Sequence, residues 1–224
     1  MNITLPDDWP SDSDIDAAKR LQQRLRSRVV TEGEVGEVRR VAGVDVHVAE
    51  RTGLTWAAIA LLDGKSLDLV ESVLAARPTS FPYVPGYLSF REIPAVLAAL
   101  ALLREPPDLV MVDGQGVAHP RGLGIAAHLG VMIGLPTIGV AKSRLYGRHE
   151  EPAAAKGGRA PLLARGRVIG SVVRTKDNVR PLYVSVGHRI GLERAVALVL
   201  AMATRYRLPE PTRQADKLSR MHPV

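Results

Sequence analysis

Two acidic residues, Asp45 and Asp113, stand where the sequence predicts buried strands. Asp113 follows the apolar run Leu109–Val112, whereas Asp45 lies inside the apolar strand Val38–Val48. A carboxylate at such a position is costly unless a cation or a hydrogen-bond donor meets it. Carboxylate oxygens are ligands that Mg²⁺ prefers. The two residues are therefore candidates for a divalent-cation site that assists phosphodiester hydrolysis.

Both residues also have purely structural interpretations. Asp113 and Gly114 form a pair that is common in turns. Strict alternation would place four residues on one face of the first strand: Val41, Gly43, Asp45 and His47. If this strand lay at the edge of a sheet, that face would be solvated and Asp45 would need no partner.

Glu92 supplies a third carboxylate. It follows Ser89 by three positions, a spacing that fits a capping box in which Ser89 caps a helix. Pro94 argues for a different start, because a proline beyond the first turn of a helix costs a backbone hydrogen bond. A helix that begins near Ile93 would leave Glu92 free to point into a site.

Lys142 follows the short apolar strand Thr137–Val140. A lysine at the end of a strand beside an acidic site could bind a phosphate or stabilise developing negative charge. The structural alternative is a surface lysine whose stem lies on apolar neighbours while its ammonium stays in water.

The elements that must position these residues predict one α/β domain over residues 1–224. It begins with a helix around Ile15–Leu25 and a loop at Glu32–Glu37. Three strands follow as an antiparallel meander, with a hairpin signal at Asp63–Gly64: Val38–Val48, Leu54–Asp63 and Ser66–Ala76. Helices and strands then alternate, which implies parallel pairing: Ile93–Arg104, Leu109–Val112, Leu123–Ile133 and Thr137–Val140.

A strand that returns after the helix Ile93–Arg104 can lie parallel to the first strand, which would bring Asp113 beside Asp45. Glu150–Gly158 is predicted to be a loop. The chain closes with a second group of strands and two helices: Leu162–Leu163, Val168–Thr175, Leu182–Val186, Leu192–Arg205 and Pro211–Arg220. The prediction is a mixed sheet, a three-strand meander followed by an αβα unit, flanked by helices.

Composition narrows the class of function. Lysine and arginine number 30 against 23 acidic residues, a formal net charge of +7, which suits a polyanionic partner such as nucleic acid. The chain has no cysteine, so disulfides and thiolate metal sites are excluded. It also has no apolar run of membrane-spanning length. We expect a cytoplasmic monomer with no membrane partner.

Six blocks of the sequence resemble the endonuclease V family, whose members are deoxyinosine-directed repair nucleases with an RNase H-like fold. The blocks occur in the family's order and span nearly the whole chain. The proline- and aromatic-rich second block is the most specific. They are Ala42–Asp45, Phe81–Glu92, Asp113–Arg121, Gly139–Lys142, Val184–His188 and Leu208–Arg213.

The resemblance implies roles for the charged residues. Asp45 and Asp113 match the ligands of Mg²⁺, for which Mn²⁺ is a substitute, and Glu92 is a further acidic member. Lys142 matches the lysine that faces the phosphate. Asp216 matches a position near the metal that some relatives fill with histidine, and a carboxylate there still suits Mg²⁺.

The resemblance also implies a nucleic-acid surface. Tyr83 matches a wedge that separates strands at the lesion, held in the segment Pro82, Val84 and Pro85, where two prolines stiffen the loop and the ring can stack on bases. Five positions match a pocket for the flipped base: Gly86, Leu88, Gly114, Gly116 and Ile125. His119 and Arg121 would contact DNA or brace that pocket, whereas His188 has no role beyond loop structure.

The predicted function is a Mg²⁺-dependent endonuclease on deoxyinosine DNA that hydrolyses the second phosphodiester 3′ to the lesion. An inosine-specific ribonuclease and a non-catalytic nucleic-acid-binding module are the alternatives. Gly122 and Gly124 weakly suggest a nucleotide-binding Rossmann turn, but no third glycine completes that pattern.

Overall fold

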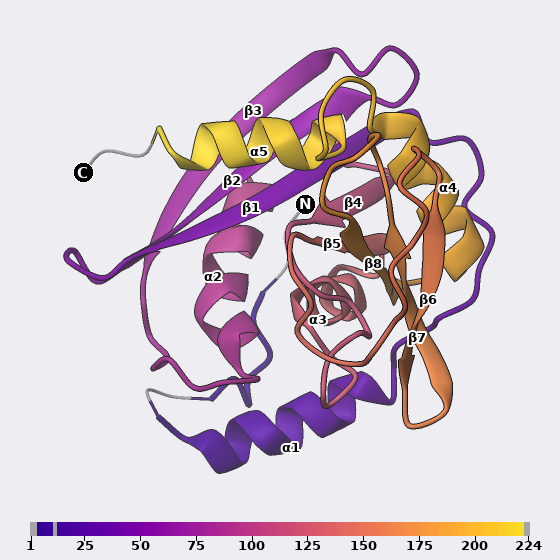
Figure 1. Cartoon of the computed structure of the whole chain (residues 1–224). Coiled ribbons are helices and arrows are strands. Elements are labelled where there is room, and N and C mark those ends of the chain that lie inside the picture. The colour runs from indigo at the N-terminus through magenta and orange to yellow at the C-terminus, as the bar shows by residue number, and fades with distance from the viewer. Residues whose placement is uncertain (1–3, 11–12, 222–224) are drawn as a thin grey trace.

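A single eight-stranded sheet runs through the computed structural model, which describes residues 4–10 and 13–221 (Figure 1). The strand order is β3-β2-β1-β4-β5-β8-β7-β6. The strands are β1 (Arg40–Ala49), β2 (Leu54–Asp63), β3 (Leu69–Pro78), β4 (Leu109–Val112), β5 (Thr137–Ala141), β6 (Arg159–Ala164), β7 (Arg167–Val173) and β8 (Leu182–His188).

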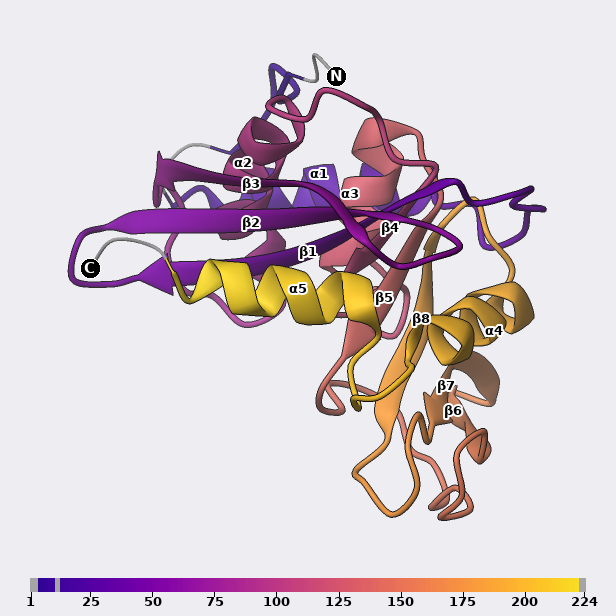
Figure 2. The ribbon, with the colours of Figure 1, turned by 90° about the horizontal axis from the view of Figure 1, so that it is seen from above.

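Helices cover both faces of this sheet (Figure 2). One face packs against α4 and α5, the other against α2 and α3, and α1 lies outside α2 and α3. The three layers bury a continuous apolar core on each side of the central strands. The helices are α1 (Ile15–Arg26), α2 (Leu88–Leu100), α3 (Ile125–Ile133), α4 (Leu192–Met202) and α5 (Glu210–Ser219).

The central pairings agree with the predicted topology. β1 is antiparallel to β2 and parallel to β4, and β4 is parallel to β5. The second strand group joins the same sheet through antiparallel pairing of β5 with β8. Because β4 ends opposite Val44, in the middle of β1, the residue after β4 lies beside the central part of β1.

The edge-strand interpretation of the segment around Asp45 is wrong. β1 lies between β2 and β4, and α5 packs across the face that carries Gly43 and Asp45. A Cβ atom on Gly43 would lie 1.9 Å from the carbonyl oxygen of Pro211. A glycine at this position therefore lets α5 approach the strand closely.

The predicted start of α2 at Ile93 is also wrong, because the helix begins at Leu88. Tyr87 precedes its first residue and makes no side-chain cap, so Ser89 is not the cap of a capping box. The Ser89 hydroxyl instead lies 2.9 Å from Nδ1 of His128. The burial of Phe90 and Ile93 outweighs the cost of Pro94 inside the helix.

Other boundaries differ by a few residues. The third strand begins at Leu69 instead of Ser66, because Asp63 accepts hydrogen bonds from the amides of Lys65 and Ser66 and holds them in a turn. α4 ends at Met202, three residues before the predicted end.

The strand predicted at Leu162–Leu163 is longer than expected, because β6 pairs with β7 along its whole length. Glu150–Gly158 contains no helix or strand, in agreement with the prediction of a loop. No helix among the described residues is long and apolar enough to cross a membrane.

Candidate active site

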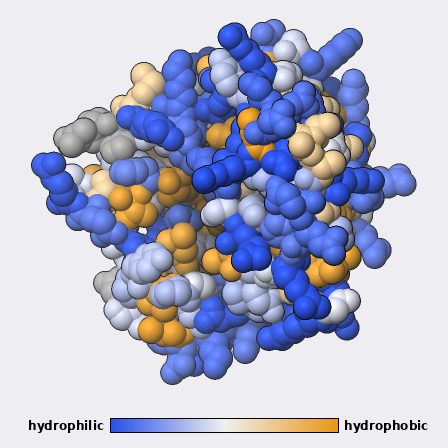
Figure 3. Space-filling view, viewed as in Figure 1, coloured by the Kyte–Doolittle hydropathy of each residue, from blue (hydrophilic) through white to orange (hydrophobic). Residues whose placement is uncertain are grey.

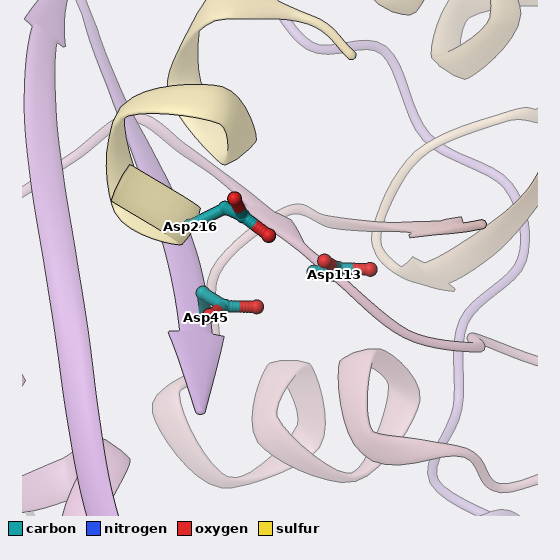
Figure 4. A group of neighbouring side chains, drawn as sticks. All are labelled: Asp45, Asp113 and Asp216. Atoms are coloured by element: carbon teal, nitrogen blue, oxygen red, sulfur yellow. The ribbon is translucent and has the colours of Figure 1, made fainter. Parts of the chain in front are cut away.

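Three carboxylates from distant parts of the chain converge where β4 ends beside the middle of β1. Asp45 lies on β1, Asp113 follows β4, and Asp216 projects from α5 (Figure 4). One oxygen from each can be chosen so that all three lie within 4.8 Å of one another. The three side chains thus form a candidate cation site.

The register of the parallel strands explains why the first two residues meet. Val44 pairs with Val112, and the amide of Asp113 donates to the carbonyl of Val44 over 2.9 Å. The residue after each of these valines is an aspartate, so the two carboxylates become neighbours. Burial, reinforced by the negative charge of Asp113, raises the pKa of Asp45 to about 6.

Lys142 compensates part of this negative charge. Its Nζ contacts Asp113 and lies 2.6 Å from Oδ1 of Asp216. Burial opposes the charged form, but the hydrogen bonds to the two carboxylates raise the pKa of Lys142 above its ordinary value. Burial likewise opposes ionisation of Asp216, yet hydrogen bonds from Lys142 and Arg220 lower the pKa of that carboxyl. Asp216 is therefore ionised beside the other two aspartates.

Glu92 lies on the first part of α2 and lines the same cavity as Asp45 and Asp113. Burial, with the charge of Asp45 and to a smaller extent that of Asp113, raises the pKa of Glu92 to about 8. The structure thus brings together all five residues that the sequence marked as catalytic: Asp45, Glu92, Asp113, Lys142 and Asp216.

A cavity of about 510 Å³ opens beside this cluster. Most of the residues predicted to bind nucleic acid line it: Tyr83, Val84, Pro85, Gly86, Leu88, Gly114, His119 and Ile125. Three predicted residues, Pro82, Gly116 and Arg121, are not in the lining. The cavity therefore joins the proposed base pocket to the carboxylates in one continuous space.

Those three residues have other positions. Gly116 packs against β8, where a Cβ atom would lie 2.0 Å from the carbonyl oxygen of Val186. The Arg121 guanidinium stacks 4.1 Å from the ring centroid of Tyr87 and lies directly behind Gly86. Arg121 thus lies behind the wall of the cavity, and Pro82 lines a separate hollow that shares Tyr83 with it.

Tyr83 stands at the rim of the cavity with 70% of its surface exposed. His119, by contrast, is buried, and burial together with the neighbouring charge of Arg121 lowers the pKa of His119 to about 4. His119 is therefore neutral at physiological pH. Its Nδ1 accepts a hydrogen bond from the amide of Arg121 over 3.1 Å, which stabilises the turn.

Two polar residues at the site were missed by the sequence analysis. Ser219, on the last turn of α5, donates a hydrogen bond to Asp45. Gln115 is buried in the cavity wall, and its Nε2 donates to the carbonyl of Ser143 over 3.0 Å, which ties the glycine turn to the loop that carries Lys142. The position of Gln115 between Gly114 and Gly116 could have identified it as a site residue from the sequence. Nothing in the local sequence identifies Ser219 in this way.

His188, the last residue of β8, is not in the lining of the cavity. Its Nδ1 accepts a hydrogen bond from the amide of Val30 over 3.2 Å. The amide of Arg189 donates to the carbonyl of Val30 over 2.7 Å. These contacts fasten the segment between α1 and β1 to the end of β8.

The donor set fits a hard divalent cation. The three groups that could ligate a metal ion are carboxylates, and one oxygen from each lies close enough to the others to share one ion. Two adjacent ionised carboxylates repel each other, and Lys142 offsets only part of that charge. The three aspartates are therefore chemically suited to hold a hard divalent metal ion.

An open mixed sheet in which acidic residues from two neighbouring parallel strands meet one from a helix packed on the sheet is the arrangement of an RNase H-like nuclease. The endonuclease V family model matches residues 23–217, nearly the whole chain, and the chain belongs to that family. The curated endonuclease V of Nostoc sp. is 52% identical over 220 residues, which cover 98% of this chain and 99% of the relative.

Solved structures agree with this assignment. Endonuclease V of Streptomyces avermitilis superposes with a TM-score of 0.91 at 46% identity, covering 98% of this chain and 96% of that one. Endonuclease V of Ciona intestinalis, in complex with a 24mer DNA that contains an inosine followed by a ribo-adenosine, superposes with a TM-score of 0.80 at 28% identity. That alignment covers 92% of this chain and 96% of the Ciona chain.

Proposed function

We propose that this nuclease repairs DNA by recognising deoxyinosine and hydrolysing the second phosphodiester 3′ to it, leaving a 3′-hydroxyl and a 5′-phosphate. The observation that carries the proposal is the continuity of one cavity with the carboxylate cluster, beside an exposed aromatic ring at the rim. The inosine-bearing DNA in the Ciona complex supports the choice of substrate.

The cavity wall suits a flipped base. A Cβ atom on Gly114 would lie 2.6 Å from Cγ2 of Ile125, so any larger residue there would disturb the lining. Glycine backbone can approach the edge of a base closely. Hypoxanthine lacks the exocyclic amine of guanine, and a tight wall at that edge would reject guanine by steric exclusion.

The phosphate would lie between the carboxylates and Lys142. Asp45 and Asp113 would hold Mg²⁺, with Asp216 as a further ligand, and the bound ion would polarise the phosphoryl oxygen and stabilise the leaving oxygen. Lys142 would donate to a phosphate oxygen. Ser219 fixes the orientation of Asp45, and Tyr83 would fill the space left by the flipped nucleotide.

We further infer that the chain is one catalytic domain, since the single sheet passes through both strand groups. Activity as a monomer in the cytoplasm stays a prediction, and sedimentation of the pure protein would test its oligomeric state.

The decisive experiment is a nicking assay on matched strands that contain deoxyinosine, inosine in RNA, or no modified base. We expect Mg²⁺-dependent nicking of the deoxyinosine strand at the second 3′ phosphodiester, and none of the unmodified strand. Mn²⁺ should replace Mg²⁺. Exclusive cleavage of the RNA strand would establish the ribonuclease alternative, and binding without cleavage of any strand would establish a non-catalytic module.

A further inference from the structure

A second hollow, of about 450 Å³, lies across the Lys142 loop from the catalytic cavity. The two share only Lys142, Ser143 and Arg144 in their linings. The rest of the second hollow is formed by the loop between β7 and β8, by Tyr183 on β8 and by Glu151. We call this second hollow the basic groove.

Two arginines hold the walls of the basic groove in place. Arg174 is buried, and it donates to the carbonyls of Pro152, Ala153 and Val179 as well as to Glu151. The positive charge of Arg174 is therefore neutralised within the protein by Glu151. The groove is thus a built feature of the fold, since one side chain joins two of its walls.

Arg207 joins the remaining wall to the catalytic loop. It donates to the carbonyl of Lys142 over 2.7 Å, to that of Arg180 over 2.8 Å and to that of Pro181 over 2.9 Å. A displacement of the β7–β8 loop would therefore shift the backbone at Lys142. This tie makes the groove and the carboxylate cluster parts of one surface.

Arg144 and Arg180 remain as exposed positive charges in the groove. Within the described part of the chain, neither guanidinium has a hydrogen-bond acceptor or an acidic partner. Glu151 is the one acidic residue of the lining, and Arg174 already pairs with it over 2.6 Å. Hydrophilic side chains also cover most of the face seen in Figure 3. The unpaired charges are suited to bind an anion.

We propose that the basic groove binds backbone phosphates of the cleaved strand on the 3′ side of the cut, with Arg144 and Arg180 as the contacting residues. The inference rests on the proposed function. The base cavity lies on one side of Lys142 and the groove on the other, so a strand whose lesion occupies the cavity would continue 3′ into the groove. Guanidinium groups bind phosphate through paired hydrogen bonds.

The test uses the full chain and its Arg144→Ala, Arg180→Ala and doubly substituted variants. Single strands with one deoxyinosine, a constant 5′ arm and a 3′ arm of about 3 or about 12 nucleotides serve as probes. We expect the long arm to strengthen wild-type binding about tenfold and the double variant to lose that gain. The association constant falls as salt rises, and each substitution should make the slope of its logarithm against log salt less steep by about 0.7.

Arg194→Ala is the matched control, because Arg194 is an exposed arginine on α4 whose loss changes the net charge equally. It should keep the gain from the long arm. If the double variant binds strands with the short and the long 3′ arm equally more weakly than wild type does, the proposal is overturned. If the wild-type protein nicks deoxyinosine strands but binds the long and short 3′ arms equally, only this inference fails. If the wild-type protein nicks no deoxyinosine strand, the proposed function fails.

Discussion

The carboxylate cluster and the basic groove share the Lys142 loop but are supported differently. Asp45 lies on β1 and Asp113 directly follows β4, each next to a fully buried valine, and their spacing follows from strand register. The walls of the groove are loops, tied together by Arg174 and Arg207 through backbone carbonyls. Hydrolysis at a phosphorus atom requires that the catalytic groups have fixed positions. Contacts to the phosphates of a nucleic-acid strand tolerate small adjustments. Substitutions in the cluster should therefore abolish function, and those in the groove should reduce it by degrees.

The largest effect should come from the cluster. Asp113→Asn removes a charge needed to hold the cation, and we expect nicking of deoxyinosine DNA to fall at least about a thousandfold while binding of the strand persists. Single-turnover nicking and fluorescence anisotropy measure the two quantities. Asp68→Asn, at an exposed aspartate in the β2–β3 connection, is the control. Wild-type nicking by the Asp113 variant would remove that residue from the site.

The support of the cluster by the core can be tested at Gly43. An added methyl group would meet the Pro211 carbonyl and push α5, with Asp216, away from β1. We expect Gly43→Ala to lower the free energy of unfolding by about 3 kcal/mol and to reduce nicking. Denaturant unfolding measures the first effect. Gly36→Ala, where no described atom would lie within 4 Å of the new Cβ, should be neutral.

The core behind the cavity should also respond to pH. Burial lowers the pKa of His128 to about 3, whereas the unfolded chain has the ordinary value of 6.5. Between these values only the unfolded state binds the proton, so stability is full above about pH 6.5 and falls by up to about 1.4 kcal/mol per unit below it. His128→Asn should weaken this dependence, as unfolding curves at several pH values would reveal. An unchanged dependence would contradict the assignment.

A smaller effect is expected at the exposed rim. Tyr83→Ala removes a ring that could stack on a base, and we expect about a tenfold loss of affinity for deoxyinosine strands with no change in the Mg²⁺ concentration needed for nicking. Tyr83→Phe keeps the ring and should bind as wild type does. Equal affinity of the alanine variant would exclude the wedge role.

Much of the fold followed from local patterns. The bounds of β2 and β4 were predicted correctly, because unbroken apolar runs ended by charge or glycine have few other solutions. The start of α2 was not, since Ser89 and Pro94 are ambiguous locally and the outcome depends on Phe90 and Ile93 packing against other elements. At the start of α2, burial of side chains against other elements outweighed the local preferences of Ser89 and Pro94.

The sequence by itself determined the chemical inventory of the site: carboxylates after apolar runs, a glycine turn, a stiff loop with an exposed tyrosine, and no thiolate. The sequence also predicted that Asp113 lies beside Asp45, and the tertiary structure decided how the other groups reach them. Asp216 and Ser219 reach Asp45 because α5 packs on β1 at Gly43, and Gly116 turns away toward β8. Arg144 and Arg180 face one groove because Arg207 ties their loops together. Such contacts join residues far apart along the chain, and no local pattern encodes them.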